Sequence, residues 1–154
     1  MFHIALFEPE IAGNVGNIAR TCLATGTTLH LIRPLGFRLT DEALRRSGMD
    51  YWDEVDVEVH ASFAAFSIKF AEAFERARVF ALTTKGQASY SEASYQKGDV
   101  FLFGPESRGL PEPVRNQTQP LRIPMVPEAR SLNLATSVAI MTYEAWQQLE
   151  FEGQ

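Results

Sequence analysis

Residues 8–20, EPEIAGNVGNIAR, interleave polar side chains with glycines in a way that could hold a ligand. Asn14 can cap a helix, and Arg20, which follows one and a half turns later, offers a guanidinium to an anionic group. Gly13 and Gly16 permit close backbone approach. A plain strand-to-helix turn explains the same residues equally well. The segment has neither G-x-G-x-x-G nor Gly-Lys-Ser/Thr, which disfavours dinucleotide and nucleoside triphosphate sites.

A second stretch, residues 103–113 with the sequence FGPESRGLPEP, is expected to be a rigid loop. Its backbone is restricted by three prolines, Pro105, Pro111 and Pro113, and two glycines, Gly104 and Gly109, allow the sharp turns between them. Such a loop presents its N–H and C=O groups in fixed directions, which suits a flat ligand. Glu106 and Arg108 could serve that ligand, or they could simply pair with each other.

A third stretch, residues 122–134 with the sequence RIPMVPEARSLNL, must bend before a long apolar helix. Pro124 and Pro127 lack N–H donors, so a central strand cannot continue through them. We expect Ser131 to cap the following helix and Asn133 to lie in its first turn, beside free N–H groups. Capping alone accounts for Ser131, and a ligand site is the alternative.

Other chemistries find little support. The histidines at positions 3, 30 and 60 have no metal-ligand spacing to Cys22 or to one another, so no zinc site is expected. There is no G-x-S-x-G elbow and no distinctive carboxylate pair, which disfavours a hydrolase. The single cysteine excludes an internal disulfide and agrees with a reducing compartment.

The composition is that of one folded domain covering residues 1–154. No apolar run approaches the roughly 20 residues that span a bilayer, and the acidic N-terminus is unlike a secretory signal, so we expect a cytoplasmic protein. A net charge of −5 gives no general attraction to nucleic acid. Any polyanion would need a local basic patch, for which the candidates are Arg20, Arg45, Arg46, Lys85, Arg108, Arg122 and Arg130.

The elements that must position these loops alternate between strand and helix. Strands are predicted at residues 2–7, 28–32, 55–59, 78–84, 100–104 and 121–124. Helices are predicted from Asn14, from Ser62 and from near Ser131, the last with apolar residues on more than one face. Several strands are almost continuously apolar, which favours an α/β fold with a mainly parallel sheet flanked by helices. Ligands bind such sheets at the carboxyl ends of the strands.

Taken together, NVGNIAR, LFGPESRGLP and RIPMVPEARSLNL resemble, in order and spacing, the three motifs of the SpoU-like branch of the SPOUT RNA methyltransferases. The likeness covers essentially the whole chain. It implies S-adenosylmethionine-dependent methylation of a ribose 2′-hydroxyl in tRNA, at the wobble cytidine or uridine of leucine tRNAs. It also implies a C-terminal deep trefoil knot, although general rules count knots as essentially absent, and a homodimer formed through the first and last helices.

The resemblance also assigns residues. It places Arg20 nearest the reacting hydroxyl, within a polar set completed by Asn14, Glu106 and Asn133. The cofactor contacts that it implies are Leu82, Thr83, Gly104, Ile123, Met125, Ser131 and Leu132. The proposed RNA contacts are Arg45, Arg46, Lys85, Arg108 and Arg130. The sulfonium methyl is already activated, so no metal is required. One departure is that Ala12 and Gly13 stand where the family commonly has proline.

The sequence leaves three other functions open. The enzyme could methylate another tRNA or rRNA nucleotide, since composition does not distinguish them. A non-catalytic RNA-binding module would explain the loop arginines but not a rigid apolar pocket. A flavodoxin-like domain would share the strand and helix rhythm, but its phosphate site would need a loop richer in hydroxyls than the first one.

Overall fold

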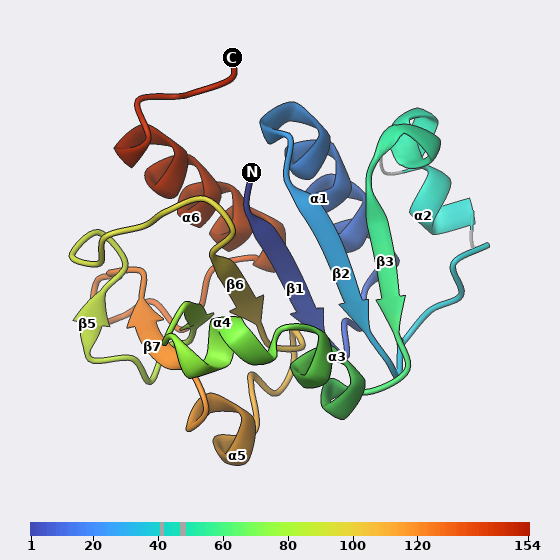
Figure 1. The fold of residues 1–154 in the computed structure, drawn as a ribbon. Coiled ribbons are helices and arrows are strands. Elements are labelled where there is room, and N and C mark those ends of the chain that lie inside the picture. Colours follow the sequence, from blue (N-terminus) through green and yellow to red (C-terminus); the bar gives the residue numbers. More distant parts are fainter. Residues whose placement is uncertain (41, 47–48) are drawn as a thin grey trace.

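The computed structural model describes residues 1–40, 42–46 and 49–154, without the side chains of residues 43, 45 and 49–51. Within that part of the chain, seven parallel strands form one sheet in the order β3-β2-β1-β6-β4-β7-β5 (Figure 1). The strands are β1 His3–Phe7, β2 Thr28–Ile32, β3 Val57–His60, β4 Val79–Leu82, β5 Ala88–Ser89, β6 Val100–Phe103 and β7 Gln119–Arg122. The predicted α/β fold with a parallel sheet is confirmed.

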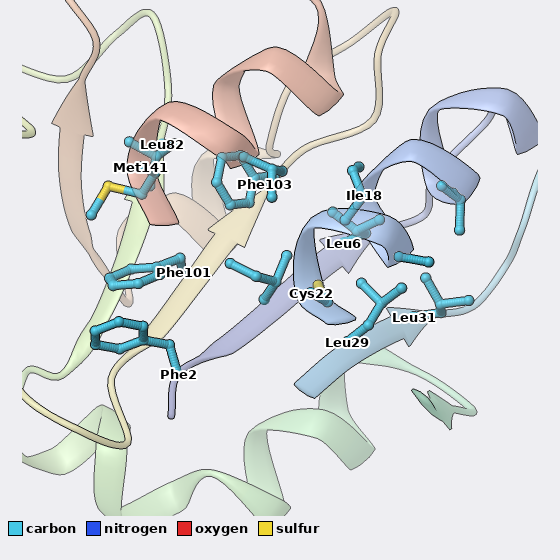
Figure 2. Close-up of a cluster of buried hydrophobic side chains, with 14 of the residues drawn as sticks. Phe2, Leu6, Ile18, Cys22, Leu29, Leu31, Leu82, Phe101, Phe103 and Met141 are labelled. Carbon is cyan, nitrogen blue, oxygen red and sulfur yellow. The ribbon is translucent and has the colours of Figure 1, made fainter. Parts of the chain in front are cut away.

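Both faces of the sheet are covered, which is why its central strands read as continuously apolar. In β1, Ile4 and Leu6 join the core under helices α1 and α6, whereas Ala5 and Phe7 join the core on the opposite face. Figure 2 shows the first of these cores, in which the side chains from β1, β2 and β6 meet those of Ile18 on α1 and Met141 on α6. This packing fixes α1 and α6 beside each other.

The helices in chain order are α1 Ala12–Thr25, α2 Glu42–Arg46, the 3₁₀ helix η1 Met49–Glu54, α3 Phe63–Lys69, α4 Ala71–Glu75, α5 Glu112–Arg115 and α6 Leu134–Gln148. The helix predicted from Ser62 is interrupted at Phe70, which separates α3 from α4. Ser62 does cap α3, because its hydroxyl accepts a hydrogen bond from the Ala65 N–H. None of the described helices is long and apolar enough to cross a membrane.

Two predicted helix starts were wrong. Helix α1 begins at Ala12, so Asn14 lies inside it and does not act as its cap. Helix α6 begins at Leu134 and is capped by Asn133, whose side chain accepts from the Thr136 N–H, and not by Ser131. The proline-containing bend keeps the chain out of helical geometry up to Asn133, which moves the cap two residues later.

Candidate active site at the carboxyl ends of β4, β6 and β7

A pocket of about 510 Å³ opens where β4, β6 and β7 end. It is lined by residues from each of the three polar stretches and from the segment after β4. All seven predicted cofactor contacts line it: Leu82, Thr83, Gly104, Ile123, Met125, Ser131 and Leu132. The stretches therefore converge as expected for ligands of parallel sheets, although the role of each residue stays a prediction.

A row of polar side chains joins the three stretches at the pocket wall. The Glu106 carboxylate accepts hydrogen bonds from the backbone N–H groups of Glu10 at 2.8 Å and Ile11 at 3.2 Å, and from Asn14 Nδ2 at 3.3 Å. Asn14 Oδ1 in turn accepts from Asn133 Nδ2 at 3.1 Å. Each amide in the row thus has its oxygen and nitrogen assigned by a partner.

Residues 8–20 and 103–113 are also joined by hydrogen bonds in which the first stretch supplies the acceptor and the second supplies the donors. The Glu10 carboxylate accepts from the backbone N–H of Ser107 at 2.8 Å and from its hydroxyl at 2.7 Å. These bonds lower the pKa of Glu10, and the bond from the Ser107 backbone N–H has the larger effect. The sequence does not predict this contact between Glu10 and Ser107, because nothing local links two positions 97 residues apart.

Of the four residues predicted to surround the reacting hydroxyl, Arg20 alone does not line the pocket. It is exposed on α1, and at 3.6 residues per turn it points about 120° around the helix from Asn14. The chain's own pocket therefore contains Asn14, Glu106 and Asn133 without Arg20.

The predicted RNA contacts are dispersed. Arg108 and Arg130 line the pocket, as does Arg122, which had not been assigned to the site. Lys85 is exposed and follows the lining residue Thr84. Arg46 is exposed on α2, where it pairs with Glu42. The Arg45 side chain lies outside the described residues.

Replacing Glu106 with Gln should lower the free energy of unfolding by about 2 kcal/mol, because hydrogen bonds to a charged group are worth roughly 1.5–3 kcal/mol and the new amide turns a donor toward donors. Thermal denaturation measures this. Glu112→Gln is the matched control, since Glu112 is exposed at the start of α5. Equal stability of the two variants would contradict a structural role for the Glu106 carboxylate.

Within the described residues, an all-parallel sheet carries a loop-lined pocket at the carboxyl ends of its strands, which is the arrangement of cofactor-binding α/β proteins. Within that class, residues 1–143 match the model of the SpoU rRNA Methylase family, and the chain belongs to this family.

Relatives cover the full chain. A tRNA (cytidine(34)-2'-O)-methyltransferase of Methylovorus glucosotrophus is 51% identical over 99% of both chains. A solved structure concerned with the 2-OH methylation of C/U34 on tRNA has a TM-score of 0.90 and 53% identity, and covers 99% of this chain and 98% of that one. An AdoMet-bound rRNA methyltransferase from Sinorhizobium meliloti has a TM-score of 0.79 and 28% identity, and covers 96% of this chain but 56% of that longer one.

Proposed function

We propose that this protein transfers a methyl group from S-adenosylmethionine to the ribose 2′-hydroxyl of cytidine or uridine 34 in tRNA. The observation that carries the proposal is the convergence of three stretches on one pocket, in a chain that matches a tRNA (cytidine(34)-2'-O)-methyltransferase from end to end. Leucine tRNAs are the proposed substrates, and the cytoplasm is the proposed location.

The pocket fits the cofactor. Its volume lies in the range of small-molecule sites, and its lining combines apolar side chains with the backbone of three turns. We assign cofactor binding to the seven lining residues named above, with Gly104 at a point where the backbone of Gly109 and Leu110 approaches too closely for any side chain. S-adenosylmethionine supplies a methyl group that its sulfonium already activates, so the protein has only to align the ribose oxygen and ease loss of its proton.

Arg20 serves as a positioning cation in this proposal and not as a base. A guanidinium stays protonated at neutral pH, so it cannot accept the hydroxyl proton. It can hold the ribose hydroxyl and the adjacent phosphate in place while that proton passes to a phosphate oxygen or to water. The row of Glu106, Asn14 and Asn133 fixes the pocket wall against which the ribose is aligned.

We propose that a homodimer completes the site, with Arg20 of one protomer facing the pocket of its partner. Arg20 lies outside its own pocket, and the two helices assigned to the interface carry or adjoin exposed apolar side chains: Ile11 is 50% exposed before α1 and Tyr143 is 45% exposed on α6. Such side chains gain by burial against a second copy.

The proposed trefoil knot is supported by how tightly one loop encloses the end of β7. The Thr83 and Tyr90 N–H groups donate to the carbonyls of Leu121 and Arg122, both at 2.9 Å. A Cβ on Gly86 would lie 2.6 Å from the Leu121 carbonyl carbon. Pulling the chain ends apart tests the threading, because a tightened knot leaves the contour length shorter than that of 154 extended residues.

The function is tested by mapping ribose methylation in total tRNA from a strain lacking the gene, with and without the purified protein and S-adenosylmethionine. We expect methylation at position 34 to be lost and then restored in vitro. Restoration at another tRNA or rRNA nucleotide would replace the proposed substrate. Calorimetry that detects no binding of S-adenosylmethionine would instead favour the non-catalytic RNA-binding module.

A further inference from the structure

The three histidines form a row across one face of the sheet, and none of them lines the active-site pocket. His3 Nδ1 lies 3.0 Å from His30 Nε2, and His30 Nδ1 lies 3.0 Å from His60 Nε2. The parallel register creates the row: His30 stands opposite Glu58, and His60 stands opposite Ile32, two residues further along. Spacing along the sequence did not predict this cluster, since parallel strands join residues about 30 positions apart.

One end of the row has the composition and dimensions of a metal site. The ligand atoms of His30, Glu58 and His60 all lie within 4.8 Å of one another, with Glu58 Oε2 at 3.9 Å from His30 Nδ1. A tetrahedral Zn²⁺ with bonds of about 2.0–2.2 Å separates its ligand atoms by about 3.3 Å. The two separations of 3.0 and 3.9 Å bracket that value.

We propose that His30 Nδ1, His60 Nε2 and a Glu58 carboxylate oxygen bind one Zn²⁺ ion that joins edge strand β3 to β2. Two imidazoles and one carboxylate suit zinc and disfavour Mg²⁺ and Ca²⁺, which prefer oxygen ligands. A water molecule takes the fourth position. The proposal is independent of the methyl-transfer function, because the cluster lies on the α3 side of the sheet and shares no residue with the active-site pocket.

The neighbours of the cluster already supply the support that a zinc-bound histidine requires. With its Nδ1 on the metal, His30 carries its proton on Nε2 and donates it to His3 Nδ1, which fixes the ring orientation. Burial lowers the pKa of both His30 and His60. Aromatic contacts with Phe66 and Phe70 hold the rings in place.

A metal ion can reach the cluster from solvent at Glu58, where Lys69 competes for the carboxylate. His30 is fully buried, whereas the Glu58 side chain is 38% exposed and opens the cluster to solvent. Lys69, itself 48% exposed, forms a short ion pair with Glu58 Oε2. The ammonium therefore competes with a metal ion for this carboxylate, and removal of its charge should strengthen zinc binding.

The test is titration of untagged, chelator-treated full-length protein with Zn²⁺ by calorimetry and with Co²⁺ by visible spectroscopy. We expect one Zn²⁺ per chain, the intense absorption of tetrahedral Co²⁺, and a rise in Tm on the order of 5 °C at a hundredfold excess of Zn²⁺ over Kd. Mg²⁺ should give none of these. Failure to bind Zn²⁺ would leave an ordinary hydrogen-bonded histidine row and overturn the proposal.

Substitutions of single residues test which side chains bind the Zn²⁺ ion. Glu58→Gln changes a partly exposed residue and should weaken Zn²⁺ binding by more than about tenfold, since even outer-shell partners cost 10–100-fold. His60→Gln should do the same, and Lys69→Gln should tighten binding by about two- to fivefold. Glu72→Gln is the matched control. Glu72 is an exposed acid, as Glu58 partly is, but it pairs with Arg76 and not with a histidine. Binding unchanged by Glu58→Gln would place the ion elsewhere and reject the site.

Discussion

Replacing Arg20 with Ala should reduce kcat for methylation of tRNA position 34 by at least about a hundredfold, the usual cost of removing one group that orients or stabilises the reacting atoms. The Kd for S-adenosylmethionine should stay near its original value, because the proposed role of Arg20 is to hold the ribose hydroxyl and its adjacent phosphate, whereas the cofactor is assigned to other residues that line the pocket. Single-turnover kinetics and calorimetry measure the two quantities separately. An unchanged kcat would remove Arg20 from the mechanism.

Two further arginine variants sharpen this test. Arg20→Lys keeps the charge but loses the planar fork of donors, so we expect it to recover only part of the activity. Arg76→Ala is the matched control, because Arg76 is exposed at the C-terminal cap of α4 and pairs with Glu72 away from the pocket. A comparable loss in Arg76→Ala would mean that the effect of Arg20 comes from general charge and not from its position.

Mixed dimers decide from which protomer Arg20 acts. In a dimer of one Arg20→Ala chain and one Gly104→Ala chain, the first chain keeps an intact pocket and the second keeps its arginine. If the arginine works across the interface, that one pocket is complete and about half of the wild-type activity is expected. If it works within its own chain, the arginine is present only beside the pocket that Gly104→Ala weakens, and at a limiting S-adenosylmethionine concentration the activity should fall well below half.

The parallel sheet could be predicted because its signal is local and strong. Strands such as β1 and β6 are buried on both faces, so nearly all their residues are apolar. The two-residue strand β5 could not be predicted, since two residues carry no periodicity. The expected strand at 55–59 starts two residues before the observed β3, and β7 begins before the predicted 121 and includes Pro120.

The site illustrates how a local interpretation fails when a side chain has a distant partner. Asn14 is a residue type that often caps helices. Its side-chain amide instead forms hydrogen bonds with Glu106 and Asn133, which are 92 and 119 positions away. Propensity describes only the nearest backbone groups, so it could not anticipate these bonds. The convergence of the stretches was predictable, because loops at the carboxyl ends of parallel strands meet at one edge. Neither argument predicts that α1 turns Arg20 away from its own pocket.

Replacing Gly104 with Ala should lower the Tm by about 10 °C, from a loss of about 3 kcal/mol in the free energy of unfolding. An added Cβ would lie 2.4 Å from the Leu110 backbone nitrogen and 2.5 Å from the Gly109 carbonyl carbon. Backbone atoms cannot avoid the contact by changing rotamer, so the loop itself must move. Because Gly104, Gly109 and Leu110 all line the pocket, the affinity for S-adenosylmethionine should fall as well.

Gly109→Ala separates this steric effect from backbone strain. Gly109 has a φ of +69° but no atom within 4 Å of its hypothetical Cβ, so its replacement costs only the roughly 1–2 kcal/mol of a left-handed residue. Scanning calorimetry and cofactor titration should therefore rank Gly104→Ala as the more damaging variant in both measurements. The opposite ranking would mean that the loop after β6 yields easily at Gly104, and that a rigid pocket wall is not what holds the cofactor.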